Sequence, residues 1–373
     1  MESSEATDAV PMRHVVYDRF GGSDVLQVTE SPVPVPAGGE VLIRVHGAGL
    51  NPIDWKTRKG LGFVATQIEG RMPWTPGYDA AGEVVAVADD VTTLAPGDRV
   101  MGMIGFAESG GAYAQYAVAR ADELAIVPEE LDLVTAGGVP LAALTAWQAL
   151  FEVAGLESGQ KILIHAGAGG VGHFAVQFAL ERGAHVIATA SASNRDFLAE
   201  LGVHEVIDYH TTDIADECYG LDVVLDLIGG ETGKRSLQTL SESGVLVTIP
   251  TVTADEVVSA AEAMGVRAHG MKTRPDVFHL EEIAELIEDG DVRVHVDRVF
   301  PLEQARDAHD LLEAGHELVT YVKYGSLDEG RAAKGMKKVD SPKAVAEQAE
   351  IIITMVPDTP DVEDVLLGEA GIV

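Results

Sequence analysis

The sequence predicts an α/β protein in which a small barrel-like β domain precedes a doubly wound parallel sheet. Up to about residue 131, short apolar runs are interrupted by glycine and proline, which is typical of a small barrel. From residue 134 onward, helical patterns alternate with short apolar runs, which indicates parallel strands joined by helices. The chain of 373 residues is long enough for two domains with substantial cores.

The expected elements follow in chain order. In the first part we expect strands at residues 14–17, 25–28, 40–47, 82–87, 99–104 and 112–118. A helix is expected around residues 141–154, and then strands at 161–164, 185–189, near Val206, at 223–227 and at 244–249. Residues 61–72 and 106–111 are expected to be loops, and since loops of this kind set specificity, the sequence leaves the substrate open.

The turn after the strand at residues 161–164 carries the most informative motif. Gly167, Gly169 and Gly172 have the spacing G-x-G-x-x-G, and a helical pattern over residues 174–181 follows them. The first glycine permits a tight turn, the second lets backbone N–H groups approach phosphates, and the third allows close packing of helix on strand. We therefore expect a dinucleotide pyrophosphate at the helix N-terminus. A merely structural turn is the alternative.

The end of the next strand indicates which dinucleotide binds. Chains that bind NAD usually place an acidic residue about 20 residues after the glycines, where it holds the ribose 2′-hydroxyl. Residues 188–195 contain no acid, whereas Ser191 can donate a hydrogen bond to a 2′-phosphate and Arg195 can reach it. The expected cofactor is therefore NADP(H). In the alternative interpretation, Ser191 caps the following helix and Arg195 is solvated.

Composition excludes several classes of partner. The formal net charge is −34, with the acids spread along the chain, so the surface repels nucleic acid and anionic membranes. Because 46% of the residues are hydrophobic, disorder does not explain this charge. We expect a halophilic protein, stabilised by salt that screens the self-repulsion and unstable in dilute buffer.

Cysteine content and the N-terminal residues predict a cytoplasmic protein. Cys218 is the single cysteine, so neither an intrachain disulfide nor a thiolate metal cluster can form. Residues 1–11 are acidic and polar, without the basic and apolar regions of a signal peptide. No apolar run is long enough to span a bilayer.

Several motifs, in order across residues 12–312, resemble the zinc-independent quinone oxidoreductase branch of the medium-chain dehydrogenase/reductase superfamily. They are the glycine turn and residues 39–45, 51–56, 76–82, 96–100, 144–147 and 206–209. The resemblance implies a GroES-like substrate domain over residues 1–132, completed by about 296–325, and a Rossmann NADP(H)-binding domain over 133–295. It also implies an active site in the cleft between them, and a homodimer.

The resemblance also implies cofactor contacts. Thr145 matches a position beside the nicotinamide, and Tyr209 matches an NADPH contact, although Tyr209 can equally be a surface aromatic at a strand end. The other positions that match the family's NADPH contacts are Ala168, Gly170, Val171 and Ser191.

Departures from the zinc-dependent alcohol dehydrogenases predict that no metal binds. Those enzymes carry a cysteine where this chain has Asn51 and a His-Glu pair where it has Tyr78 and Asp79, and they have a four-cysteine lobe. A catalytic zinc needs about three protein ligands, and the histidines here show no ligand spacing. Alcohol dehydrogenation is therefore the poorer interpretation.

Without a metal, reduction of a quinone or an α,β-unsaturated carbonyl needs less stabilisation by the protein than oxidation of an alcohol does. The substrate's own carbonyl delocalises the negative charge that hydride brings. Asn51 and Lys56 are the candidate hydrogen-bond donors to the substrate oxygen, and Tyr78 is a candidate donor or proton source. In the alternative interpretation, Asn51 is a turn residue, Lys56 is solvated and Tyr78 belongs to the core. A non-catalytic NADPH-binding protein is the second functional class.

The C-terminal residues resemble a different family. Residues 340–360 are similar to an internal fragment of the β-hydroxyacid dehydrogenases, which include 3-hydroxyisobutyrate dehydrogenase, and the join lies near residues 312–316. That family's glycine turn and catalytic lysine are both missing, so no second dinucleotide is expected. We expect residues 317–324 to replace the lost closing strand and 326–373 to form an atypical extension. An inactive chimera is therefore a further alternative.

Overall fold

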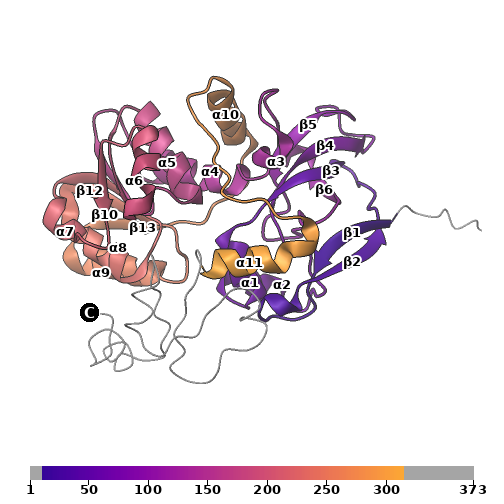
Figure 1. Ribbon diagram of the computed structural model, residues 1–373, viewed down its shortest axis with the longest axis horizontal. Helices are drawn as coiled ribbons and strands as arrows, with labels where there is room; N and C mark the ends of the chain where they lie inside the picture. Colours follow the sequence, from indigo (N-terminus) through magenta and orange to yellow (C-terminus); the bar gives the residue numbers. More distant parts are fainter. Residues whose placement is uncertain (1–10, 315–373) are drawn as a thin grey trace, which may run out of the picture. The chain divides into compact units, whose positions relative to one another are not determined.

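The computed structural model describes residues 11–314 and shows an antiparallel and a parallel sheet (Figure 1), which confirms the predicted fold class. The chain forms two compact units, residues 1–306 and 307–373, and only residues 307–314 of the second are described. These residues continue helix α11 (Ala305–Ala314). The predicted closing strand at 317–324 and the extension at 326–373 lie outside the described residues.

The antiparallel sheet has five strands in the order β6-β3-β4-β5-β7. Their bounds are β3 (Glu40–Gly49), β4 (Asp79–Val87), β5 (Arg99–Met103), β6 (Tyr116–Arg120) and β7 (Leu124–Ile126). Gly82 is required on β4, because a Cβ there would collide with the backbone oxygen of Arg44 on β3. A separate ribbon pairs β1 (Pro11–Val16) with β2 (Gln27–Pro32). Between β3 and β4 stand the short helices α1 (Pro52–Arg58) and α2 (Gly62–Ile68).

The parallel sheet has six strands in the order β10-β9-β8-β11-β12-β13. Their bounds are β8 (Lys161–Ile164), β9 (His185–Ala190), β10 (Glu205–Asp208), β11 (Leu221–Asp226), β12 (Leu240–Thr248) and β13 (Arg267–Gly270). Since successive strands extend outward on both sides of the β8–β11 pair, the chain reverses direction there. Ligands of such sheets bind at the carboxyl ends of the strands at this point.

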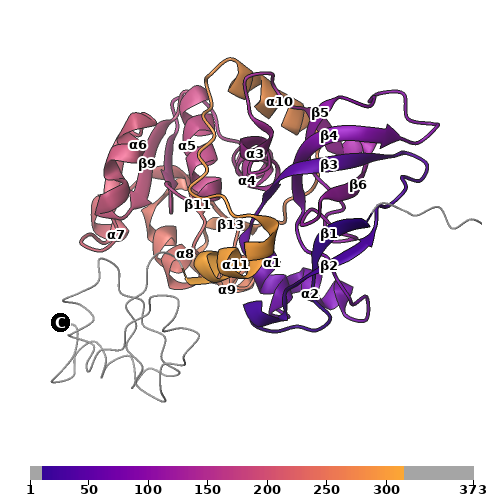
Figure 2. The same ribbon diagram turned by 45° about the vertical axis from the view of Figure 1, so that its right-hand side comes forward.

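Helices connect and cover these strands, as Figure 2 shows for α5, α6 and α8. The helices from α3 onward are α3 (Leu133–Ala136), α4 (Pro140–Trp147), α5 (Gly170–Glu181), α6 (Arg195–Glu200), α7 (Ile214–Glu217), α8 (Gly230–Ser236), α9 (Ala254–Met264) and α10 (Val277–Glu288). Short turns of other helix types are η1 (Ser23–Val25), η2 (Ala121–Glu123), η3 (Gln148–Val153, a π-helix), η4 (Ala192–Asn194), η5 (Leu237–Thr239) and η6 (Leu302–Gln304).

Three local expectations were wrong. The strand expected at 25–28 begins only at Gln27, because the N–H of Val25 bonds the carbonyl of Gly22 and closes the helical turn η1. The strand expected at 112–118 begins at Tyr116. Residues 61–72 contain helix α2, whose buried face includes Val64 and Ile68, so apolar burial organises a segment expected to be a loop.

A continuous apolar core joins the two sheets within residues 11–306. It includes Val41 and Ile43 of β3, Leu144 of α4, and Ile162 and Ile164 of β8. The expected helix at 141–154 is present, but α4 ends at Trp147 and continues as the π-helical turn η3. Among the described residues, no helix combines the length and apolar character needed to cross a membrane.

Candidate active site

The glycine turn lies between β8 and α5, at the carboxyl end of the sheet. Gly167 packs against β9, where an added Cβ would lie 2.7 Å from the Cβ of Ala188. A Cβ on Gly172 would collide with the backbone oxygen of Ala166, whereas a Cβ on Gly170 would meet open space. The first and third glycines of the motif are therefore required by packing.

The turn leaves backbone donors available. Helix α5 begins at Gly170, and within residues 11–314 the N–H groups of Ala168, Gly170 and Val171 have no hydrogen-bond acceptor. Unpaired N–H groups at a helix N-terminus, together with the positive end of its dipole, form an anion site. The open space at Gly170 lets a phosphate approach these groups closely. The residues present therefore fit a dinucleotide pyrophosphate.

A buried histidine, His165, lies directly before the glycine turn and is held by hydrogen bonds. The Ser236 hydroxyl donates to the carbonyl of Thr232 at 2.7 Å, so it accepts from His165 Nε2 at 2.8 Å. Thr189 Oγ1 accepts from the N–H of Ala166 and lies 3.2 Å from His165 Nδ1, to which it donates. Every partner suits a neutral ring, and burial lowers the pKa of His165. This histidine therefore holds the turn in place rather than carrying charge.

The residues expected at a 2′-phosphate lie at the ends of β9 and β10. The Ser191 hydroxyl contacts Ser193 Oγ at 2.9 Å and accepts from Asn194 Nδ2 at 3.2 Å, and it makes no capping bond to η4. Arg195 is exposed and forms no ion pair among the described residues. Tyr209 is 53% exposed. Asp208 pairs with Ala190 across the strands, but its carboxylate accepts from the N–H of His210.

Thr145, the residue matched to the nicotinamide end, is buried on α4. Its hydroxyl donates to the carbonyl of Leu141 and lies 2.6 Å from the hydroxyl of Thr273, which follows β13. Gln148 bonds the backbone of Arg274 twice, through Nε2 at 2.9 Å and Oε1 at 3.1 Å. These contacts fix residues 273–274 beside α4.

Asn51 and two buried carboxylates form a polar centre where β3, α1 and β4 meet. Asn51 Nδ2 donates to Asp79 Oδ2 at 2.8 Å, and the second oxygen of Asp79 accepts from the N–H of Leu141 at 2.8 Å. Asp54 Oδ2 accepts from the N–H of Asn51 at 2.8 Å and from the Tyr113 hydroxyl at 3.3 Å. Burial raises the pKa of Asp54 to about 7 and that of Asp79 to about 8.

The other two candidate donors, Lys56 and Tyr78, differ in how deeply they are buried. Lys56 is half-buried on α1, with Nζ 5.6 Å from the centroid of the Trp55 ring, and burial lowers its pKa. Tyr78 is 1% exposed, and within residues 11–314 its hydroxyl has no hydrogen-bond partner. Its ring contacts the Phe106 ring edge-on at 5.1 Å, and Phe106 in turn contacts Phe63 of α2 at 6.3 Å. Tyr78 thus belongs to the apolar core, as in the alternative interpretation, and its unpartnered hydroxyl leaves it a candidate donor.

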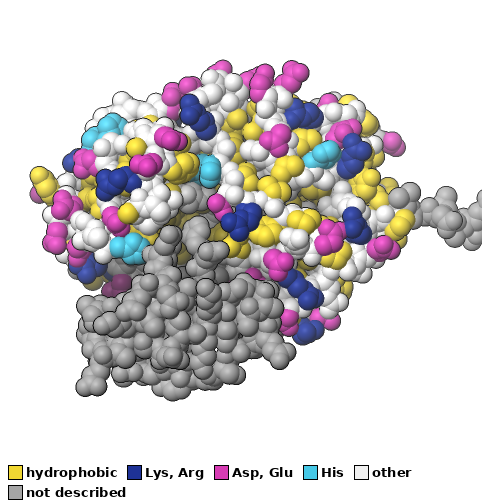
Figure 3. Space-filling model, in the orientation of Figure 1, with side chains coloured by type: hydrophobic (Ala, Val, Ile, Leu, Met, Phe, Trp, Pro, Cys, Tyr) yellow, Lys and Arg dark blue, Asp and Glu magenta, His cyan; other side chains and the backbone are white. Residues whose placement is uncertain are grey.

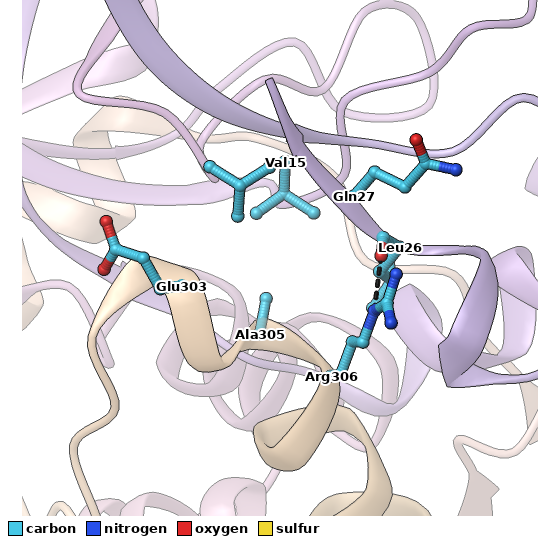
Figure 4. Close-up of a pocket in the computed structure, with 7 residues that line it drawn as sticks. Val15, Leu26, Gln27, Glu303, Ala305 and Arg306 are labelled. Atoms are coloured by element: carbon cyan, nitrogen blue, oxygen red, sulfur yellow. Dashed lines mark hydrogen bonds between the residues drawn. The ribbon is translucent and has the colours of Figure 1, made fainter. Parts of the chain in front are cut away.

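Two further features lie away from these residues. In the described part of the chain, Glu152, Asp276 and His279 are close enough to share a metal ion, but the Arg274 guanidinium bonds Glu152 at 2.6 Å and Asp276 at 3.0 Å, so an ion pair neutralises them. A pocket lies between the β1–β2 ribbon and residues 303–306 (Figure 4), where Arg306 Nε donates to the carbonyl of Leu26 at 2.6 Å. None of its lining residues is a candidate site residue.

Two features of the site were not predicted from the sequence: the buried carboxylates of Asp54 and Asp79, and residues 272–274. Asp54 and Asp79 lie inside the motifs of α1 and β4, but nothing in the sequence shows that both are buried. Lys272 and Thr273 lie far in sequence from the other site residues, and only the fold brings them there. No strand was predicted before residues 272–274, so the sequence offered no signal for them.

A parallel sheet with a dinucleotide-type glycine turn, joined to this antiparallel domain, defines an oxidoreductase that binds a pyridine nucleotide. Residues 37–129 match the family described as alcohol dehydrogenase GroES-like domain, and residues 201–318 match the family described as zinc-binding dehydrogenase. The chain belongs to the medium-chain dehydrogenase/reductase superfamily, among the quinone oxidoreductases and their homologues. The predicted family and the GroES-like domain are thereby confirmed.

Three similar proteins cover most of the chain. The chloroplastic quinone-oxidoreductase homolog of Spinacia oleracea is 33% identical over 82% of this chain and 96% of its own length. The quinone oxidoreductase structure from Coxiella burnetii is 40% identical, covers 83% of this chain and 97% of that one, and has a TM-score of 0.79. The Escherichia coli quinone oxidoreductase complexed with NADPH is 27% identical over 81% and 96% of the two chains, with a TM-score of 0.70.

The C-terminal residues match another family, as the sequence predicted. Residues 307–373 match the NAD binding domain of 6-phosphogluconate dehydrogenase, and this match overlaps the zinc-binding dehydrogenase match at residues 307–318. The overlap includes the join predicted at 312–316. The C-terminal residues are therefore similar to a second nucleotide-binding family.

Proposed function

We propose that the protein is a zinc-independent reductase that transfers hydride from NADPH to a quinone or an α,β-unsaturated carbonyl compound. The observation that carries the proposal is the combination of an open glycine turn with a substrate-side donor set of Asn51, Lys56 and Tyr78. An amide, an amine and a phenol suit a developing oxyanion and are poor ligands for zinc. The names of the relatives point to the same substrate class.

When bound, NADPH supplies a hydride from C4 of its nicotinamide ring. The backbone donors at Gly170 and Val171 hold the pyrophosphate, and Ser191 and Arg195 hold the 2′-phosphate. Arg195 is suited to this role because it is exposed and no described carboxylate neutralises it. The Asp208 carboxylate accepts a hydrogen bond from the N–H of His210 in the following loop. Ser191 and Arg195 are therefore the side chains available to the 2′-phosphate.

The substrate oxygen gains negative charge as hydride adds to the conjugated system. One N–H of Asn51 is used by Asp79, which fixes the amide and leaves its second N–H for the substrate. Lys56 adds an ammonium group, whose pKa is lowered by burial, so that it also gives up a proton more readily. These side chains orient the substrate and stabilise the oxyanion.

NADPH oxidation in molar KCl tests the proposal against a panel of ortho-quinones, para-quinones and enones, with NADH as the control. Turnover that prefers NADPH is the expected result. The foreign C-terminal segment keeps a second function open, that of a non-catalytic NADPH-binding protein. Tight NADPH binding without turnover of any acceptor would favour that function, and failure to bind would overturn both.

A further inference from the structure

The backbone around Lys272 is fixed on both sides. Before it, the N–H of Met271 donates to the carbonyl of Thr248 on β12 at 3.3 Å. After it, the Thr273 hydroxyl contacts Thr145, and Gln148 bonds the Arg274 backbone in both directions. Lys272 therefore stands at a defined place, one residue from the contact with the side chain matched to the nicotinamide end.

From this place the Lys272 side chain reaches the β domain. Its Nζ lies 4.6 Å from the centroid of the Phe63 ring on α2. Phe63 contacts Phe106 edge-on, and Phe106 contacts Tyr78, so three aromatic rings run from the lysine toward the Asn51 centre. Phe63 and Phe106 are both partly exposed. A planar conjugated ring is the kind of ligand that such a run of aromatic side chains binds.

The charge on Lys272 is not neutralised. Lys272 is exposed and forms no ion pair or hydrogen bond among the residues that the structure describes. Helix α2, beneath it, carries no charged residue, and the adjacent helix α1 adds Lys56, while the Asp54 carboxyl is fully buried. In a chain of net charge −34, Lys56 and Lys272 are thus basic side chains on this part of the chain.

We propose that Lys272 is a specificity-determining residue that binds a negatively charged substituent, such as a carboxylate or sulfonate, on the quinone or enone substrate. This inference deepens the proposed function and rests on it. The ring of the substrate lies along Phe63 and Phe106, and the ammonium of Lys272 leaves the Phe63 face to pair with the anion. The acidic remainder of the protein surface repels the same anion, so a local cation is needed to admit it.

A matched pair of acceptors tests this: 1,2-naphthoquinone and 1,2-naphthoquinone-4-sulfonate, assayed with NADPH and the full chain. Lys272→Met should raise KM for the sulfonate about three- to tenfold and leave both kinetic constants for the neutral quinone within about twofold. Lys272→Arg should restore the wild-type ratio of the two KM values. Lys161→Met is the matched control, since Lys161 also lies over an aromatic ring, that of Tyr219, at 6.0 Å.

Comparing the KM ratio of the two quinones at low salt and in 1 M KCl separates direct contact with Lys272 from long-range attraction. In 1 M KCl the screening length is only about 3 Å, so a preference that depends on contact persists while general steering disappears. Equal KM changes for both quinones, or no change for either, would overturn the inference and leave the proposed function intact. If the wild-type protein reduces neither quinone, the proposed function fails, and the inference fails with it.

Discussion

The amide of Asn51 donates to the buried carboxyl of Asp79 at 2.8 Å, and the other oxygen of Asp79 accepts from the N–H of Leu141 at the start of α4. One carboxyl thus ties the β domain to the first long helix of the nucleotide-binding domain. It also sets the orientation of the amide that we assign to the substrate oxygen. Asn51 is therefore both a catalytic candidate and part of the junction between the domains.

Substituting Asn51 should affect both roles. Asn51→Ala removes the donor and leaves Asp79 Oδ2 buried without a partner, which costs about 1–3 kcal/mol of folding stability. Loss of one oxyanion donor should lower kcat for a neutral quinone by about 100- to 1,000-fold. The affinity for NADPH, measured by fluorescence titration, should not change. An unchanged kcat in folded protein would remove Asn51 from the catalytic account.

The glycine turn predicts unequal effects at two neighbouring positions. A side chain at Gly172 would collide with the Ala166 oxygen, so Gly172→Ala should abolish NADPH binding and lower the unfolding temperature. Gly170→Ala is the matched control, because its Cβ meets nothing within 4 Å, and its effect on unfolding should be small. Thermal unfolding of both variants measures the difference. NADPH titration should show weaker binding for both, because a side chain at Gly170 fills the space that admits the phosphate. Equal unfolding temperatures of the two variants would contradict the packing argument.

The parallel sheet and its glycine turn could be predicted from local sequence, whereas helix α2 and the contact of Lys272 with Phe63 could not. The strands around the glycine turn are continuous apolar runs, so their pattern indicates both the sheet and the site at its edge. The α1–α2 segment was harder to interpret, because the burial of Val64 and Ile68 depends on tertiary packing. Lys272 reaches Phe63 across 209 positions of the chain, a contact that no local pattern encodes.

The cofactor preference should depend on Ser191 and Arg195. Arg195→Ala should raise KM for NADPH by about tenfold and leave KM for NADH unchanged, because only NADPH carries the 2′-phosphate. Ser191→Ala should act in the same direction with a smaller effect. Arg71→Ala serves as a control, since Arg71 is an exposed arginine over the Trp74 ring. Equal changes with both cofactors would place the 2′-phosphate elsewhere.

The buried carboxyl of Asp54 predicts a pH-dependent stability. Its pKa rises from 3.8 to about 7 on folding, so the native state binds its proton more tightly than the unfolded state does. Its contribution is fully present below pH 4 and is lost as the pH rises to about 7, at up to about 1.4 kcal/mol per pH unit. Asp54→Asn cannot ionise, so its stability relative to wild type should improve as the pH rises from about 4 to about 7 and should change little above that.

Urea unfolding at constant KCl measures that difference at each pH. Asp122→Asn is the control: the Arg120 side chain lowers the pKa of the exposed Asp122, so this carboxylate is ionised in both states above about pH 5, and its removal should change stability by an amount that does not vary with pH. Parallel stability curves for the wild type and Asp54→Asn would show that Asp54 does not titrate in this range.

The surface charge predicts a strong salt dependence. Asp and Glu side chains are spread over the visible face (Figure 3), and the chain carries 60 acidic against 26 basic residues. Screening of their repulsion should raise the unfolding temperature continuously from 0.1 M to about 2 M KCl. Calorimetry across this range measures the effect. An unfolding temperature that does not respond to KCl would contradict a halophilic adaptation.

The most direct test of the central claim is the steady-state reduction of a neutral quinone in molar KCl by protein treated with a chelator, with the metal content measured in parallel. Zinc-free protein should retain full activity, and kcat/KM should be higher with NADPH than with NADH. Activity that disappears with zinc and returns when zinc is added would contradict this claim, as would equal use of the two cofactors.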